Sequence, residues 1–237
     1  MTNYRLERAR DPDALARQAA DWLAAQISLV LDQRDRCSLA LSGGSTPARA
    51  YSLLGQEHLP WDRVDVVLGD ERWVAADDPS SNARMLRQTL MAEGPGSAAR
   101  FHAVPTVELA DAQASASALQ QLLGRLCSGE PPVFDLILLG LGDDGHTASL
   151  FPGTDATTIT DRWATVGCGK GLDRITLTAP VLSAAREVMF LVSGSAKRQA
   201  LQRLLDPEES PQRTPAKLAS PAKQVLILAD QDAASGL

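Results

Sequence analysis

Short apolar segments rich in β-branched residues and leucine alternate with segments of helical periodicity along most of the 237-residue chain. Several of the apolar segments contain at most one polar residue, which is typical of strands buried on both faces. The predicted strands span residues 38–41, 64–68, 101–104, 134–139, 175–178, 188–192 and 225–228. Strands that alternate with helices predict an α/β fold with a mostly parallel sheet and crossover helices on both of its faces.

Four helices are predicted between the strands. Apolar residues recur at helical spacing from residue 12 to 31, and Asp11 followed by Pro12 suits the N-cap and the first turn. The other helices are expected at about residues 80–91, 111–126 and 195–205. Residues 206–211 are expected to form an exposed loop too short to link two domains, so we predict one domain over residues 1–237.

Composition narrows the possible partners. The net charge of −6 is spread along the chain, and aromatic residues make up only 4%, so a nucleic-acid partner is not expected, whereas a local cluster of cations can still bind a small anionic substrate. No stretch approaches the ~18 apolar residues of a membrane span, and no signal peptide is apparent. We therefore expect a soluble cytoplasmic protein without a membrane partner.

Cysteine and histidine spacing gives no sign of a metal site or a disulfide framework. The three cysteines, Cys37, Cys127 and Cys168, lie far apart and form no C-x-x-C pair, which fits a reducing compartment. His58 and His102 lie in segments unlike that of the third histidine, and no paired-histidine motif occurs. We expect no metal.

Ligands of open parallel sheets bind beyond the carboxyl ends of the strands, so the segments after the predicted strands are candidate sites. The first, LSGGSTP at residues 41–47, places Gly43 and Gly44 in a sharp turn, with Thr46 and Pro47 as N-cap and first residue of a helix. Free N–H groups at such a helix start attract an anion, although an ordinary turn explains the motif equally well. The segment lacks the G-K-[ST] of a Walker loop and the second glycine of a nucleophile elbow.

Charged residues follow two further strands. In GDERWV, residues 69–74, Arg72 is suited to a bidentate phosphate contact, and Asp70 to orienting a substrate hydroxyl or a protonated base. In SGSAKR, residues 193–198, Lys197 would lie in the first turn of a helix, where its charge opposes the helix dipole unless a phosphate relieves the conflict. Solvated surface residues are the alternative in both segments.

The segment LGLGDDGHTASLFPG, residues 139–153, matches the dinucleotide fingerprint G-x-G-x-x-G, but its context does not fit. A dinucleotide site needs about ten helical residues after the glycines, whereas Pro152 and Gly153 stop a helix within about two turns. We expect instead a glycine-lined loop with a short helix start that presents Asp144 and His146 to solvent. A histidine with a pKa near its ordinary value of about 6.5 is suited to general base catalysis, and a structural histidine is the alternative.

Four motifs, in this order, resemble the 6-phosphogluconolactonase family over nearly the whole chain. They are LALSGGSTP, VVLGDERWV with the downstream DDPSSNARML, FDLILLGLGDDGHTASLFPG, and VMFLVSGSAKRQAL. The resemblance implies a Rossmann-like α/β domain of the kind shared with sugar-phosphate isomerases and deaminases. It also implies hydrolysis of 6-phospho-D-glucono-1,5-lactone in the pentose phosphate pathway, without a metal or an organic cofactor.

The resemblance also assigns roles to residues. His146 is similar to the family's catalytic base, and Arg72 and Lys197 to its phosphate ligands, with Asp144 and Asp70 as supporting polar groups. The expected binding loop consists of Ser42, Gly43, Gly44, Ser45 and Thr46.

Two other functions stay open. Glucosamine-6-phosphate deaminases share the glycine turn and the D-G-H motif, but typically carry a glutamate in an A-F-N-E-P context where this chain has ASLFP at residues 148–152. A sugar-phosphate-sensing module would need a helix-turn-helix segment, and the residues before the first predicted strand supply one convincing helix. The sequence leaves open whether the protein is a monomer or a small homo-oligomer.

Overall fold

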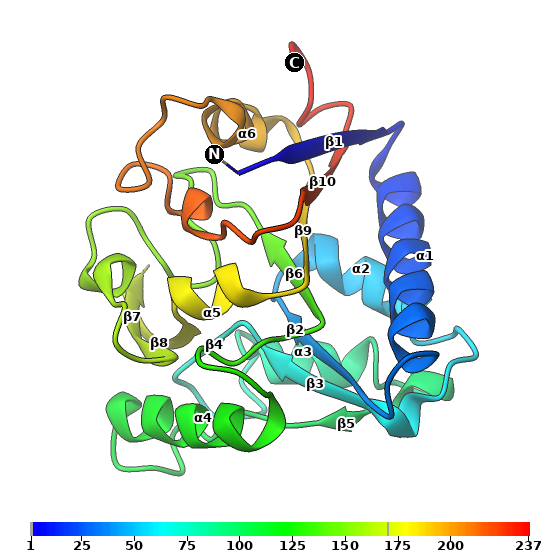
Figure 1. Cartoon of the computed structure of the whole chain (residues 1–237), viewed down its shortest axis with the longest axis vertical. Coiled ribbons are helices and arrows are strands. Elements are labelled where there is room, and N and C mark those ends of the chain that lie inside the picture. Colours follow the sequence, from blue (N-terminus) through cyan, green and yellow to red (C-terminus); the bar gives the residue numbers. More distant parts are fainter. Residues whose placement is uncertain (1, 170) are drawn as a thin grey trace.

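A computed structural model describes residues 2–169 and 171–237 (Figure 1). The α-helices are α1 (Pro12–Leu31), α2 (Ser45–Leu54), α3 (Asn82–Gln88), α4 (Ala112–Leu126), α5 (Ala179–Ala184) and α6 (Arg198–Leu205). The strands are β1 (Tyr4–Ala9), β2 (Cys37–Leu41), β3 (Val64–Leu68), β4 (Asp70–Arg72), β5 (Arg100–Phe101), β6 (Leu136–Gly140), β7 (Ala164–Gly169), β8 (Leu172–Leu177), β9 (Glu187–Val192) and β10 (Val225–Asp230).

The main sheet has seven strands in the order β1-β10-β9-β6-β2-β3-β5, and each neighbouring pair is parallel. A second sheet, β4-β8-β7, is antiparallel. The predicted α/β fold with a mostly parallel sheet is therefore confirmed. The strands β3 and β5, which follow β2 in the chain, are added on one side of β2. The strands β9 and β10, which follow β6, are added on the opposite side of β6, so the strand order reverses between β2 and β6. Such a reversal opens a crevice at the carboxyl edge of a sheet.

Alternating strand residues build a core on each face of the main sheet. On β6, Leu136 and Leu138 pack in the cluster that contains the buried residues of α1, α2 and α3, whereas Ile137 and Leu139 pack in the cluster that contains those of α4, α5 and α6. Figure 1 shows α1 and α2 on one side of the sheet and α5 on the other. Helices cover both faces, as the sequence predicts.

The strongest sequence signals match the structure most closely. The first helix has the predicted bounds, and the side chain of Asp11 caps it by accepting the N–H of Ala14 at 2.7 Å. The signals were weaker where the prediction was wrong. The strand β1 was not predicted, because it lies at the sheet edge and five of its six residues are exposed or half-buried. The helix expected at about residues 80–91 is shorter in the structure, where α3 covers Asn82–Gln88. The strand β5 covers only two residues, and the expected loop at 70–72 forms β4.

Across the described parts of the chain, no helix combines the length and the apolar character that a membrane crossing requires.

Candidate active site

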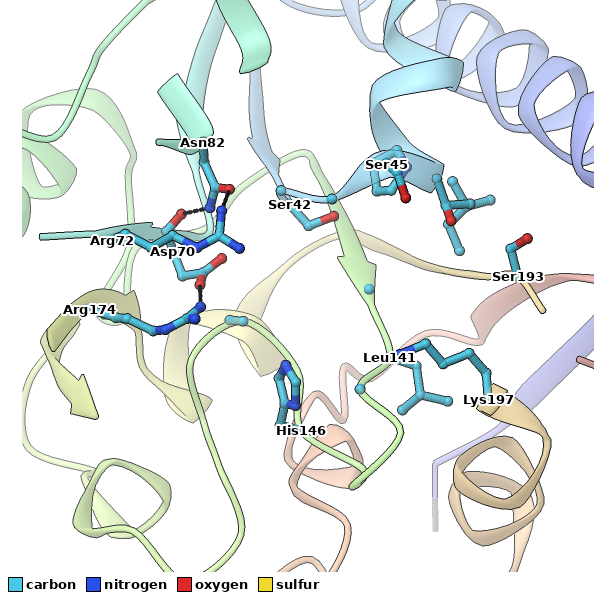
Figure 2. Close-up of a pocket in the computed structure, with 18 residues that line it drawn as sticks. Ser42, Ser45, Asp70, Arg72, Asn82, Leu141, His146, Arg174, Ser193 and Lys197 are labelled. Carbon is cyan, nitrogen blue, oxygen red and sulfur yellow. Dashed lines mark hydrogen bonds and ion pairs between the residues drawn. The ribbon is translucent and has the colours of Figure 1, made fainter. Parts of the chain in front are cut away.

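A pocket of about 240 Å³ lies where the strand order reverses, and loops that follow β2, β3, β6 and β9 line it (Figure 2). Its volume is slightly below the ~300–1,000 Å³ of sites for drug-sized ligands, so it suits a small metabolite. The lining includes every predicted site residue except Asp144, namely Ser42, Gly43, Gly44, Ser45, Thr46, Asp70, Arg72, His146 and Lys197.

The glycine turn, residues 42–47, leads from β2 into α2. Gly44 has φ +116° and is the N-cap of α2, so the prediction that Thr46 is the cap was wrong by two residues. Because Gly44 has no side chain to cap the helix, the first N–H groups of α2 stay available to a ligand at the positive end of the helix dipole. The hydroxyl of buried Ser42 also lines the pocket and has no partner among the described residues.

Arg72 is held at the end of β4 by its neighbours. Its Nη1 donates to the carbonyl oxygen of Ser80 at 2.8 Å and to Oδ1 of Asn82. Asn82 in turn donates from Nδ2 to the carbonyl oxygen of Asp70 at 2.8 Å. The guanidinium is thereby fixed on one side of the pocket before any ligand binds.

Glu71 lies between Asp70 and Arg72 in the sequence, but it does not line this pocket and is only 2% exposed. Its carboxylate accepts the backbone N–H groups of Arg72, Asn82 and Ala83 at 2.7–2.8 Å. Burial raises the pKa of Glu71, and these N–H groups act in the opposite direction. The side chain therefore ties the start of α3 to β4 and keeps Asn82 next to Arg72.

The His146 turn, residues 142–146, closes on itself. Gly142 donates its N–H to the carbonyl oxygen of His146 at 2.8 Å, and Gly145, with φ +95°, allows the reversal of the chain. The expected short helix is absent from residues 141–154, where the structure has turns instead. The imidazole packs on the ring of Phe151, with 4.3 Å between centroids.

Asp144 orients the His146 ring from outside the pocket. Its Oδ1 lies 2.5 Å from Nδ1 of His146 and also accepts the N–H of His146 at 3.0 Å. Partial burial acts to raise the pKa of Asp144, but the hydrogen bonds and charge of His146 outweigh it, so the pKa lies below its usual value. The side chain of His146 is 17% exposed and that of Asp144 is 44% exposed, so the prediction that the loop carries both into solvent holds only for Asp144.

Lys197 approaches from the opposite side of the pocket. It ends a short 3-10 turn, Ser195–Lys197, that precedes α6. The carboxylate of Asp230, 1% exposed at the end of β10, holds this turn by accepting the hydroxyl of Ser193 at 2.5 Å and the N–H of Gly194 at 3.0 Å. Lys197 forms no ion pair with any described residue, and Figure 2 shows its side chain pointing into the cavity.

Three polar residues of the pocket were not predicted as site residues: Asn82, Arg174 and Ser193. Asn82 begins a helix, where an asparagine is an ordinary residue, and Ser193 stands in a glycine turn, where serine is common. Arg174 is only 7% exposed on β8, which places it among the buried residues. The available signal was an arginine directly before the predicted apolar strand at residues 175–178. Arginines are seldom buried without a partner, so a buried one indicates a paired or functional group.

Fold and pocket together define an α/β domain with a cation-lined site at the carboxyl edge of its sheet. The model of the family glucosamine-6-phosphate isomerases/6-phosphogluconolactonase matches residues 10–228, and the chain belongs to this family. It is 41% identical to 6-phosphogluconolactonase from Synechocystis sp. over 226 residues that cover 94% of each chain. It is 39% identical to 6-phosphogluconolactonase from Nostoc sp. over 229 residues, which cover 96% of this chain and 95% of the relative.

Among solved structures, the chain is similar to 6-phosphogluconolactonase from Trypanosoma brucei, with a TM-score of 0.88 at 29% identity over the whole of both chains.

Proposed function

We propose that the protein hydrolyses 6-phospho-D-glucono-1,5-lactone to 6-phospho-D-gluconate, a step of the oxidative pentose phosphate pathway. The relatives that resemble it over nearly their full length carry the name of this enzyme. One observation carries the proposal for this chain. The carboxylate-oriented imidazole of His146 lines the same pocket as two cations, Arg72 and Lys197, so a phosphorylated lactone can meet both kinds of group at once.

His146 is the general base in this proposal. Asp144 engages Nδ1, and Nε2 has no hydrogen-bond partner among the described residues, so Nε2 is the nitrogen available to take a proton. It takes one proton from a water whose oxygen bonds to the lactone carbonyl carbon. When the bond from that carbon to the ring oxygen breaks, the imidazolium returns the proton to the departing oxygen. No covalent enzyme intermediate is needed, and a positioned base typically contributes ~10²–10⁴ in rate.

Arg72 and Lys197 bind the phosphate in this proposal. They enter the pocket from opposite sides, with Ser42 of the glycine turn between them (Figure 2). A phosphate over the glycine turn would meet both cations and the open N–H groups of α2. Binding energy at the phosphate then holds the ring so that water and carbonyl meet at His146.

The experiment compares lactone turnover by the wild type and His146→Ala, with spontaneous hydrolysis subtracted and ammonia release from glucosamine 6-phosphate measured in parallel. His58→Ala, at an exposed histidine, is the matched control. We expect kcat for the lactone to fall by about 10²–10⁴ in His146→Ala and to stay unchanged in His58→Ala. Full kcat in folded His146→Ala would refute the role of His146 as the general base. Ammonia release by the wild type would favour a deaminase function. Binding of the lactone without turnover would favour a sensor function.

A further inference from the structure

Arg174 has no role in the function proposed so far, yet it lines the pocket, and its side chain is 8% exposed. Its Nε donates to the carbonyl oxygen of Gly169 at 3.3 Å, which is the sole hydrogen bond of the Arg174 side chain to the described residues. Its Nη1 lies 3.7 Å from Oδ2 of Asp70, a distance that suits an ion pair but exceeds that of a hydrogen bond. The terminal N–H groups of this arginine are therefore free for a ligand in the pocket.

The guanidinium is positioned next to the proposed base. Cζ of Arg174 lies 5.4 Å from the centroid of the Phe151 ring, and the same ring packs against the imidazole of His146. Figure 2 shows Arg174 and His146 on adjoining parts of the pocket wall. Arg174 and His146 therefore line the same part of the pocket, where a water on His146 would meet the lactone carbonyl.

The attack of water places negative charge on the carbonyl oxygen, and hydrogen-bond donors must stabilise it. The N–H groups of the His146 turn are poor candidates because they are already bonded. Gly142 donates to the carbonyl oxygen of His146, Gly145 donates to that of Gly142 at 3.0 Å, and the N–H of His146 binds Asp144. The turn that carries the base therefore has few donors left for the oxyanion.

Arg174 and Lys197 differ in whether an anionic side chain lies next to them, and this difference suits them to different roles. Asp70 forms an ion pair with Arg174 at 3.7 Å, whereas Lys197 has no anionic partner among the described residues. A phosphate dianion gains most from an uncompensated cation and a helix N-terminus. A single oxyanion instead needs directed donors at a fixed point, which a guanidinium held by Asp70 and Phe151 provides.

We propose that Arg174 is a catalytic residue of the lactonase reaction, whose terminal N–H groups donate hydrogen bonds to the lactone carbonyl oxygen and stabilise the oxyanion as water adds. This inference rests on the proposed function. Arg174 keeps its proton throughout and forms no covalent bond. The N–H groups of the glycine turn are left to the phosphate.

The test measures kcat and KM for the phosphorylated lactone, and the inhibition constant of inorganic phosphate, in Arg174→Gln and Arg174→Lys. The lysine variant keeps the positive charge beside Asp70 and carries the test if the glutamine variant does not fold. Arg186→Gln is the matched control, because Arg186 lies 3.3 Å from buried Asp135, outside the pocket. Thermal unfolding of each variant confirms that it is folded.

We expect kcat to fall by about 10²–10³ in both Arg174 variants, as on loss of one oxyanion donor, with the inhibition constant of phosphate unchanged. Lys197→Ala should show the opposite pattern: the inhibition constant of phosphate should rise, and kcat should change little. The proposal is wrong if kcat falls less than about tenfold, or if KM and the inhibition constant rise together, which would make Arg174 a phosphate ligand. A wild type without lactone turnover would instead refute the proposed function.

Discussion

One carboxylate oxygen, Oδ1 of Asp144, holds both the ring and the backbone of His146, at 2.5 Å from Nδ1 and 3.0 Å from the N–H. A carboxylate at Nδ1 favours the tautomer that carries its proton there, so Nε2 is left as the basic nitrogen. Both contacts lie within a turn of a few residues, so the base is oriented without help from the substrate.

Removing this carboxylate should impair the base without removing it. In Asp144→Asn the amide can hold the ring in either tautomer, and we expect kcat to fall by about 10- to 100-fold with KM little changed. Steady-state kinetics on the lactone check this. Asp143→Asn, at the exposed neighbour, is the control and should keep the wild-type kcat. Equal kinetics in the two variants would contradict the orienting role.

The lowered pKa of Asp144 predicts a pH-dependent contribution to stability. The folded pKa lies below the unfolded value of about 3.9, so the ionised carboxylate stabilises the fold above that value, and this contribution disappears as the pH falls through the folded pKa. The difference in free energy of unfolding between the wild type and Asp144→Asn should therefore shrink between about pH 5 and pH 3. Urea unfolding at stepped pH measures it, and a difference that grows on acidification would refute the prediction.

Loss of the Lys197 cation should weaken substrate binding first. Lys197→Ala should raise KM by about 10- to 100-fold, the equivalent of one charged hydrogen bond of about 1.5–3 kcal/mol, with a smaller effect on kcat. Asp230→Asn should shift KM in the same direction, because it loosens the turn that carries Lys197. Lys223→Ala, at an exposed lysine paired with Glu187, should behave as the wild type. An unchanged KM in Lys197→Ala would remove this residue from the phosphate site.

The lack of space beside Gly43 predicts that a larger residue there would displace Asn82 and thereby Arg72. A Cβ added at Gly43 would lie 1.9 Å from Oδ1 of Asn82, so Gly43→Ala must displace the side chain that holds the guanidinium. We expect a lower kcat/KM and a loss of about 1–3 kcal/mol of stability from overpacking. Gly69→Ala is the control, because its Cβ would meet the carbonyl oxygen of Leu41 at an ordinary 3.7 Å. Similar kinetics in both variants would show that Asn82 does not position Arg72.

Glu71 should matter for stability more than its place on a three-residue strand indicates. Glu71→Ala leaves three buried N–H groups without their acceptor, at about 1–3 kcal/mol each, so we expect a loss of at least about 2 kcal/mol. Denaturant unfolding against Glu208→Ala, at an exposed glutamate, measures the difference. A loss below 0.5 kcal/mol, the range of ordinary surface changes, would mean that other groups satisfy these N–H donors.

The fold was predictable where burial leaves a continuous apolar pattern. Central strands such as β6 and β9 gave this pattern because both of their faces are covered. The edge strand β1 did not, since only pairing with β10 makes it a strand. Short elements such as β4 depend on a partner, here β8, that is more than a hundred residues away in the chain.

The site was predictable where chemistry follows a strand directly, as at Arg72, His146 and Lys197. Arg174 escaped because it lies within a strand, on a sheet whose antiparallel pairing the sequence did not predict. The buried carboxylates of Glu71 and Asp230 escaped because most of their partners are backbone N–H groups. Every residue except proline has such a group, so no motif identifies them.

The position of β10 links the beginning and the end of the chain. The amino-terminal strand β1 pairs, within the described residues, with β10 alone, and Asp230 on β10 secures the turn that carries Lys197. During synthesis β1 therefore cannot join the sheet before β10 has left the ribosome. A chain truncated before residue 225 would lack both the partner of β1 and the carboxylate that holds the turn before Lys197.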